Sequence, residues 1–295
     1  MISTDTPANV IEGTRSTHDS VRTAARGPRF VALVGLSSYL AMSGIALAAS
    51  GHALLAAMHA AGIALAAWGQ LDRSRVARAV GDLLPLAVAP ALYGEIPLLI
   101  TALGSSYHDA TAQGWEVAVF GVQASRVFAT FVPSVTVSEV LHAGYLAYYP
   151  AIFAPPLLLY ARGNRRGLAE TVAVLTFVYL VCWMIFAVVP VQGPRYLWTA
   201  DAPDGPFRRL TVTLLAAGSS RGAAFPSSHM AVSVAQAVMA LRWQPRVGAV
   251  LVVVAALVGL GAVYGGFHYG IDMIAGAALG LVVAVATIAL SGPRR

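Results

Sequence analysis

The sequence predicts an all-α fold, a polytopic bundle of about six to eight transmembrane helices. Of its 295 residues, 58% are hydrophobic and only 11% are charged, whereas about a quarter of the residues of a soluble domain are charged. Several apolar runs approach the roughly 20 residues that a helix needs to cross the hydrocarbon core of a bilayer. Arginine-containing segments separate these runs. We therefore expect a single transmembrane domain over residues 29–292.

Eight apolar segments are the candidate spans. They cover residues 30–50, 52–69, 80–103, 138–160, 168–190, 225–241, 247–264 and 267–290. The stretch 104–137 is too polar to span and too apolar to be a free loop. Its Trp115, Val119 and Phe120 predict a helical segment that lies along the membrane interface. Residues 191–224 form the long polar connection within the membrane domain.

The basic residues predict the orientation of the chain. All 19 are arginines, and with the N-terminus inside, 14 of them fall in inner segments. The positive-inside rule then predicts a cell-membrane protein with cytoplasmic N- and C-termini and an extracytoplasmic loop 191–224. The net charge of +6 is spread between the spans, which argues against a nucleic-acid partner. Residues 1–28 lack an apolar centre, so we expect a disordered cytoplasmic tail rather than a signal peptide.

Two histidines and one aspartate stand at the outer ends of two spans. His229 opens the sixth span in AFPSSHMAV, and His268 opens the eighth in FHYGID. Ionisable groups are costly inside a membrane, so their presence there indicates a function. Asp272 follows His268 by four residues, so on a helix the two side chains share a face. An aspartate in that place can hold an imidazole in one tautomer and stabilise its positive form.

The residues around the first histidine form a predicted anion site. Ser227 and Ser228 follow a proline at the start of the sixth span, where hydroxyls and free backbone N–H groups can hold an anion. The outer loop adds Arg195 and Tyr196 in GPRY, and Arg221 just before the serines. A guanidinium group matches two phosphate oxygens at once. The alternatives are a simple helix-start role for the serines and headgroup anchoring for the arginines.

A second group of polar residues lies in the outer half of the fourth span. Glu139, His142, Tyr145 and Tyr149 have near-helical spacing, and polar groups in a span usually face the protein interior. They are candidates to line a headgroup pocket. An aromatic belt at the membrane interface explains the tyrosines equally well.

Together these groups fit phosphoryl transfer through a phosphohistidine. In this scheme His268 attacks phosphorus, Asp272 stabilises the charge that the ring gains, and His229 protonates the departing oxygen. The arginines and the N–H groups stabilise the oxygens of the transition state. The scheme requires no metal and no cofactor.

The motif FPSSH followed by HYGID resembles the second and third signatures of the phosphatidic acid phosphatase type 2 superfamily, which contains membrane lipid phosphatases and phosphotransferases. Within it, GPRY and HYGIDMIAG are most similar to the inositol phosphorylceramide synthase-like branch, and WEVAVFG and LHAGYLAYYP are looser matches. The resemblance implies the six-helix core of the superfamily. It also implies that His268 is the nucleophile, His229 the general acid and Asp272 the orienting acid.

The chain departs from the superfamily pattern in two places. The first signature of the superfamily begins with a lysine, and this chain has none, so Arg195 must serve in its place. The third signature usually carries Ser-Arg ahead of its histidine, where this chain has Gly261 and Ala262. The inositol phosphorylceramide synthase-like branch also tends to lack that arginine. The candidates to replace it are in the outer loop: Arg208, Arg209 and Arg221.

The expected function is that of an integral membrane phosphoesterase or phosphotransferase acting on a lipid phosphate among membrane lipids. The resemblance favours transfer of a phospho-headgroup to a polyol or a lipid alcohol. A lipid phosphate or polyprenyl (pyro)phosphate phosphatase is the alternative within the same chemistry. A transporter or scaffold without catalysis is the alternative from another class.

Overall fold

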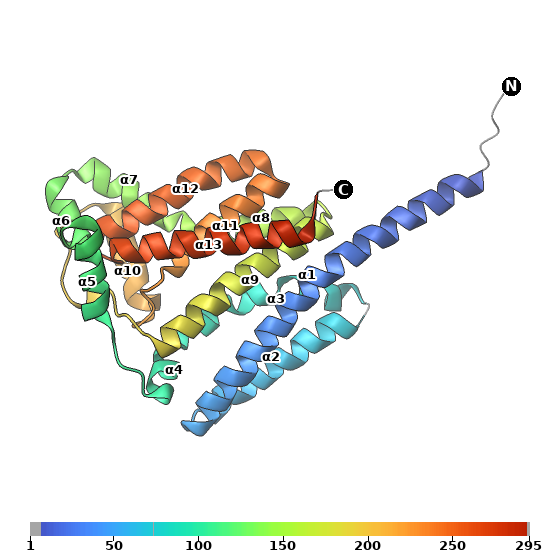
Figure 1. The fold of residues 1–295 in the computed structure, drawn as a ribbon, viewed down its shortest axis with the longest axis horizontal. Helices are drawn as coiled ribbons and strands as arrows, with labels where there is room; N and C mark the ends of the chain where they lie inside the picture. The colour runs from blue at the N-terminus through green and yellow to red at the C-terminus, as the bar shows by residue number, and fades with distance from the viewer. Residues whose placement is uncertain (1–6, 73, 294–295) are drawn as a thin grey trace.

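The computed structural model describes residues 7–72 and 74–293, with side chains described from Gly27 onward. It confirms the all-α polytopic bundle (Figure 1). Among the described residues, 6 helices are long and apolar enough to cross a membrane. They are Gly27–Ala49, Ala53–Leu71, Arg75–Gly94, Arg165–Val188, Pro245–Tyr264 and Gly270–Ser291. The number of such helices agrees with a multi-pass membrane protein.

The N-terminal part contains α1 (Pro7–Ala49), α2 (Ala53–Leu71), α3 (Arg75–Gly94) and α4 (Ile96–Leu103). The third expected span, 80–103, is thus divided at Glu95. Pro97 in the first turn of α4 lacks the N–H that would continue the hydrogen-bonding of α3, which explains the break. The stretch 1–28 overlaps the beginning of α1, and its expected disorder stays a prediction. Arg73, Arg294 and Arg295, like residues 1–6, lie outside the described residues.

The next segment crosses the end of the bundle. It forms α5 (Asp109–Phe120) and α6 (Ala124–Phe131), which lie transverse to the long helices α12 and α13 (Figure 1). This placement fits the interfacial segment expected over 104–137.

The fourth expected span, 138–160, is two helices rather than one. They are α7 (Val135–Leu146) and α8 (Tyr148–Ala161), which meet at Ala147. Pro150 is the third residue of α8 and has no N–H to donate back to α7, so the helix does not continue through this point. The break changes which side chains share a face on either side of it.

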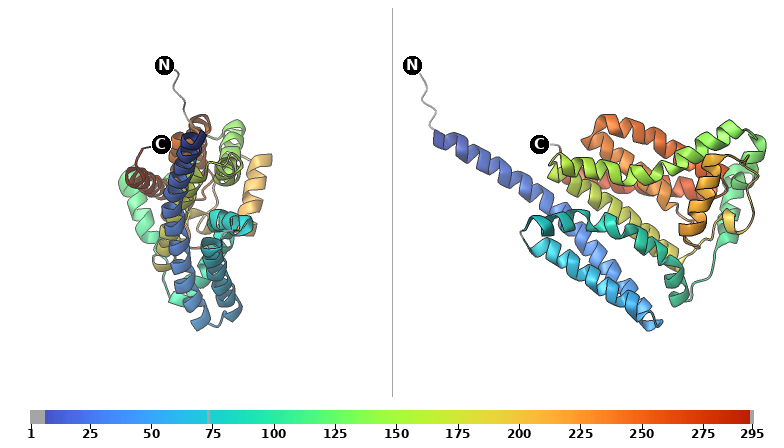
Figure 2. Two further views of the ribbon diagram at one scale, coloured as in Figure 1. Left: turned by 90° about the vertical axis from the view of Figure 1, so that its right-hand side faces the viewer. Right: turned by 180° about the vertical axis from the view of Figure 1, so that it is seen from behind.

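Helix α9 (Arg165–Val188) is the centre of the bundle, and most of its side chains are buried. Helices α1 and α3 pack along one side of it, and α11 (Ser228–Trp243) and α13 (Gly270–Ser291) along the other (Figures 1 and 2). Helix α12 (Pro245–Tyr264) packs against α11. Gly276 and Gly280 of α13 leave room for the backbone of α11, because a Cβ at either position would collide with carbonyl groups of that helix.

The polar connection 191–224 folds over the end of these helices where α11 and α13 begin. It contains a 3₁₀ turn, η1 (Pro194–Tyr196), and one amphipathic helix, α10 (Pro206–Gly218), which packs against α7. Val191 and Ala223 pair through one isolated bridge, which brings the two ends of the connection together. The loop therefore returns to the starts of α11 and α13, where the two histidines lie.

Candidate active site

The two histidines of the sequence motifs meet at one end of the bundle. His229 lies in the first turn of α11, and His268 lies in the short loop between α12 and α13. Their ring centroids are 5.8 Å apart, and both side chains are buried. A reacting atom held between them is therefore within reach of both rings.

Two acceptors hold the ring of His268 in one tautomer. Its Nδ1 lies 3.1 Å from the carbonyl oxygen of Ala224 and 3.2 Å from Oδ2 of Asp272. Because a carbonyl can only accept, Nδ1 carries the proton in the neutral ring, and Nε2 keeps its lone pair. Asp272 is itself fixed by the backbone N–H of Tyr269, which donates to Oδ2 at 2.9 Å. The arrangement prepares Nε2 of His268 to act as a nucleophile.

Burial also keeps this ring uncharged. Desolvation lowers the pKa of His268 to about 4, and the nearby positive charge of Arg195 lowers it further, whereas the carbonyl of Ala224 opposes the shift. The lone pair of Nε2 is then available at neutral pH.

A pocket opens over the two rings. It is small, with free space of about 20 Å³, which is little more than one water molecule occupies. Arg195 and Tyr196 of η1 line it, and both bind the hydroxyl of Ser219 at 2.8 Å. The guanidinium group also lies over the ring of Tyr196, with 5.1 Å between its carbon and the ring centroid. Arg195 therefore supplies a positive charge on the wall that faces His268.

Arg221 does not line this pocket but lies behind Gln192, which does. Its Nε donates to Oε1 of Gln192 at 2.6 Å, and Gln192 lines the pocket. The guanidinium group also lies over the rings of Tyr107 and Tyr196, at 5.5 and 5.6 Å. Arg221 thus supports the loop that carries Arg195.

The serines of the FPSSH motif are placed differently from the expected anion cradle. The N–H of Ser227 donates to the backbone oxygen of Asp272 at 3.0 Å, and its hydroxyl accepts the N–H of Met230 at 3.3 Å. The backbone N–H of Ser227 is therefore not free for an anion. This residue caps α11 and ties its start to α13. Ser228 is also buried and, like Ser227, does not line the described pocket.

Of the four residues expected to line a headgroup pocket, Tyr145 lines the pocket over the two histidines. Its ring stacks on His229 with centroids 5.5 Å apart. His142 lies behind the pocket wall, 5.7 Å from the ring of Phe267, with Nδ1 near the oxygens of Ser138.

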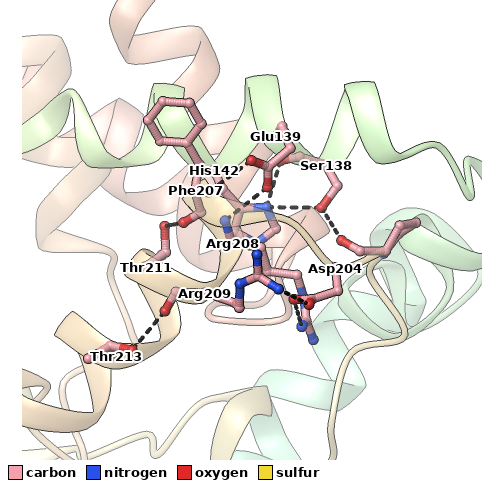
Figure 3. Close-up of polar contacts among 10 residues, drawn as sticks. Ser138, Glu139, His142, Asp204, Phe207, Arg208, Arg209, Thr211 and Thr213 are labelled. Carbon is pink, nitrogen blue, oxygen red and sulfur yellow. Dashed lines mark hydrogen bonds and ion pairs between the residues drawn. The ribbon is translucent and has the colours of Figure 1, made fainter.

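Glu139 has a structural contact instead of a place in the pocket (Figure 3). Its two carboxylate oxygens accept the backbone N–H groups of Phe207 and Arg208, at 2.8 and 3.1 Å. These N–H groups begin α10, so the carboxylate caps that helix. The spacing of Glu139 in the sequence indicated the correct face of α7 but not the partner.

The two arginines of α10 do not supply the missing phosphate contact. Arg208 and Arg209 pair with Asp204, at 3.3 and 2.9 Å, on the exposed side of the loop (Figure 3). At the position of the missing signature arginine, Ala262 is fully buried, and a Cβ at Gly261 would meet the backbone of Leu141. Within the described part of the chain, Arg195 is the arginine that lines this pocket.

Helix α5 contributes two carboxylates that the sequence did not reveal. Asp109 accepts the N–H groups of Gln192 and Gly193, each at 3.0 Å, and the hydroxyl of Tyr269 at 3.2 Å. Glu116 accepts the N–H of Ile271 at 2.9 Å. The helix therefore fastens the loop of Arg195 and the start of α13 to each other. The sequence has no local pattern that predicts these contacts, because the partners are far apart in the chain.

Aromatic rings surround His229 more closely than expected. The ring of Tyr148 lies 4.4 Å from it, and that of Tyr93 lies 6.3 Å away. The sequence pattern favoured Tyr149, but the break at Ala147 shifts the helical phase and turns Tyr148 inward. Tyr93 comes from the end of α3, just before the break at Glu95.

No group of three or more His, Cys, Asp or Glu side chains able to hold a metal ion is found in residues 7–72 and 74–293.

Comparison with known proteins gives one family match. Residues 116–286 match a family model described as the PAP2 superfamily. The matched region begins at Glu116 and includes both histidines and Asp272. No curated protein and no solved structure matches the chain.

Proposed function

Because the chain belongs to the PAP2 superfamily and is thus a phosphatase-type membrane enzyme, we propose that it transfers the phospho-headgroup of a lipid through a phosphohistidine. The observation that carries the proposal is the ring of His268. Its Nδ1 is held by two acceptors, and the residue lines the pocket together with His229 and Arg195.

The reaction would proceed in two displacements. Nε2 of His268 attacks phosphorus, and the bond between phosphorus and the departing oxygen breaks. A protonated His229 gives its proton to that oxygen. In the second step His229 takes the proton of the incoming hydroxyl, whose oxygen attacks phosphorus and breaks the P–N bond. Asp272 stabilises the positive ring of His268, and Arg195 stabilises the phosphoryl oxygens.

Transfer to an alcohol, rather than hydrolysis, is supported by the resemblance of GPRY and HYGIDMIAG to the inositol phosphorylceramide synthase-like branch. The buried Ala262 in place of the usual arginine agrees with that assignment. The acceptor would be a polyol or a lipid alcohol, and the site would face the extracytoplasmic side. Hydrolysis of a lipid phosphate is the second candidate, because the same phosphoenzyme can react with water.

The first test is the phosphoenzyme itself. Purified protein incubated with a labelled lipid phosphate or phospholipid is expected to acquire acid-labile, base-stable label. His268→Ala removes the nucleophile and should remove the label, whereas His52→Ala in the loop between α1 and α2 should keep it. Asp272→Asn should slow labelling about 100-fold or more, as expected when an orienting acid is lost. Unlabelled wild-type protein would favour a non-catalytic transporter or scaffold.

A second test identifies the acceptor. The protein is incubated with a membrane lipid extract, with and without added inositol, and the products are read by mass spectrometry. A new phosphodiester is the expected product, and free phosphate alone would identify a phosphatase. His229→Ala should bind the lipid but lose turnover by about 100-fold or more, because the departing oxygen receives no proton. Intact turnover in that variant would remove the general-acid assignment.

A further inference from the structure

Three tyrosines from three helices converge on the ring of His229. Tyr93 comes from the end of α3, Tyr145 from α7 and Tyr148 from the start of α8. The ring centroid of Tyr148 lies 4.4 Å from that of His229, and the ring of Tyr145 stacks on it at 5.5 Å with 29° between the planes. The ring of Tyr93 is perpendicular to it at 6.3 Å. His229 therefore lies in a largely aromatic environment.

The hydrogen bonds of His229 differ from those of the other histidine. Within the described part of the chain, Nδ1 of His229 is buried and has no hydrogen-bond partner. Nδ1 of His268, in contrast, is held by Ala224 and Asp272. Acceptors that receive the N–H groups of an imidazolium stabilise its charge. His229 has no such acceptor at Nδ1 there, so its charged form depends on contacts of another kind.

The surroundings of His229 also oppose its protonation. Burial lowers the pKa of His229, and the charge that His268 can carry lowers it further. Arg195 lines the same pocket and is always positive. The carboxylate of Asp272 is engaged by His268 and by the N–H of Tyr269. The proposed first displacement nevertheless needs a protonated His229, because the departing oxygen takes its proton.

The tyrosine rings offer the stabilisation that the polar groups do not. The face of an aromatic ring is negative, and it attracts a cation that lies within about 6 Å of the ring centroid. Tyr145 and Tyr148 both lie within that distance of His229. The attraction is stronger where water is excluded, and all three side chains are buried. The two rings therefore favour the charged form of His229 over the neutral form.

We propose that Tyr145 and Tyr148 stabilise the protonated form of His229 through cation–π contacts and so enable it to act as a general acid. The imidazolium gives its proton to the departing oxygen as the bond between that oxygen and phosphorus breaks, and a neutral ring remains between the tyrosines. This inference rests on the proposed phosphate chemistry at the two histidines. It makes the two tyrosines positioning residues, because they act through His229.

The test varies the leaving group, because a poor leaving group needs the proton and a good one does not. The full-length protein in detergent is assayed with dioctyl phosphate, which releases octanol, and with octyl 4-nitrophenyl phosphate, which releases a stable phenolate. Both esters give the same octylphosphoryl enzyme, so kcat/KM compares the first displacement alone. In Tyr148→Leu the ratio of kcat/KM for dioctyl phosphate to that for the nitrophenyl ester should fall about tenfold, as the loss of a buried cation–π contact predicts. Tyr145→Leu should lower the ratio in the same way.

Two controls separate the ring from its hydroxyl group and from general destabilisation. Tyr148→Phe keeps the ring but loses the bond between the hydroxyls of Tyr148 and Tyr179, at 3.1 Å, and its ratio should stay close to that of the wild type. Tyr39→Leu removes a ring of α1 that packs on Trp183 and is 5% exposed, as Tyr148 is. It should also keep the ratio. An unchanged ratio in Tyr148→Leu, or an equal fall in either control, would overturn the inference.

A second measurement does not depend on activity. The protonation of His229 is followed by NMR in protein with 15N-labelled histidine, and its signal is assigned by its loss in His229→Asn. The midpoint should lie about one pH unit lower in Tyr148→Leu than in the wild type, which corresponds to the tenfold effect. If the wild type turns over neither ester, the proposed function fails and this titration decides; equal midpoints would overturn the role of the tyrosines. If Tyr148→Leu does not fold, Tyr145→Leu takes its place.

Discussion

At the scale of single residues, the chemistry of the site depends on what each polar atom already contacts. His268 has its Nδ1 occupied by Ala224 and Asp272, which leaves one nitrogen for substrate. Ser227 donates its N–H to Asp272 of α13, and its hydroxyl accepts the N–H of Met230 in α11, which leaves it a structural role. Both residues belong to the sequence motifs described above, and their hydrogen bonds distinguish the role of His268 from that of Ser227.

The pKa of His268 predicts the pH dependence of activity. Burial lowers this pKa from 6.5 to about 4, so the ring stays neutral and nucleophilic until the pH falls well below 6. The proposed mechanism also needs a protonated His229, and burial lowers the pKa of that ring to about 3. We therefore expect kcat/KM to rise as the pH falls from 7 toward 4, because more of His229 is protonated, and to decline below about pH 3, where His268 is protonated as well. The measurement requires a phosphodiester lipid, because the second ionisation of a phosphomonoester falls near pH 6.

The same profile tests the contribution of Arg195. Its positive charge lowers the pKa of His268, so Arg195→Gln should move the acid limb of the profile to higher pH, in addition to weakening phosphate binding. Arg209→Gln serves as the control, because Arg209 is an exposed residue paired with Asp204. A wild-type acid limb at pH 6.5 or above would show that His268 titrates as an ordinary histidine.

At the scale of elements, short helices at the histidine end of the bundle position the residues of the candidate active site. Helix α5 holds the loop before η1 through Asp109 and the start of α13 through Glu116. Glu139 of α7 holds the start of α10 in a similar way. In each case a carboxylate accepts backbone N–H groups that would otherwise have no partner in their own helix or turn.

This arrangement predicts a large effect of Asp109→Asn. An asparagine has one acceptor oxygen and cannot receive both N–H groups and the hydroxyl of Tyr269 as the carboxylate does. Loss of hydrogen bonds to a charged group costs about 1.5–3 kcal/mol, so we expect KM to rise about tenfold or more as Arg195 moves. The control is Asp204→Asn in the exposed ion pairs, which should change KM less than about threefold. Equal effects of the two substitutions would contradict a positioning role for Asp109.

At the scale of the whole molecule, the end opposite the histidines is closed by buried ion pairs. Glu170 of α9 is 1% exposed and pairs with Arg166 at 2.9 Å and Arg242 of α11 at 3.0 Å. The same two arginines donate to the carbonyls of Ser291 and Gly292, at 2.6 Å each. Arg166 and Arg242 therefore connect α9, α11 and the end of α13.

Glu170→Gln should accordingly destabilise the protein without changing its chemistry. Removing one partner of a buried ion pair costs about 3–5 kcal/mol, so the melting temperature in detergent should fall clearly below that of the wild type. Activity well below that temperature should remain within about twofold, because Glu170 is at the far end of the bundle. Asp204→Asn makes the same carboxylate-to-amide change in exposed ion pairs and should leave the melting temperature nearly unaltered. A wild-type melting temperature in Glu170→Gln would show that these pairs contribute little.

The sequence predicted the helical class and the two histidine segments because both depend on local signals. Long apolar runs and a proline followed by Ser-Ser-His need no knowledge of distant residues. The breaks at Glu95 and Ala147 were missed because hydropathy does not register a lost backbone hydrogen bond. Asp109 was missed because its partner Gln192 is 83 residues away in the chain. The roles of the catalytic residues stay predictions until the labelling experiment is done.

The break at Glu95 has a consequence for how this enzyme could be altered. It brings Tyr93 to the pocket wall, where the hydroxyl of Ser220 donates to its backbone oxygen. Tyr93 precedes the family-matched region, residues 116–286. One wall of the pocket is thus supplied by α3, which precedes the family-matched region. Under the proposed function, exchanging the segment α1–α4 between related enzymes would change which headgroup is accepted without altering His229 and His268.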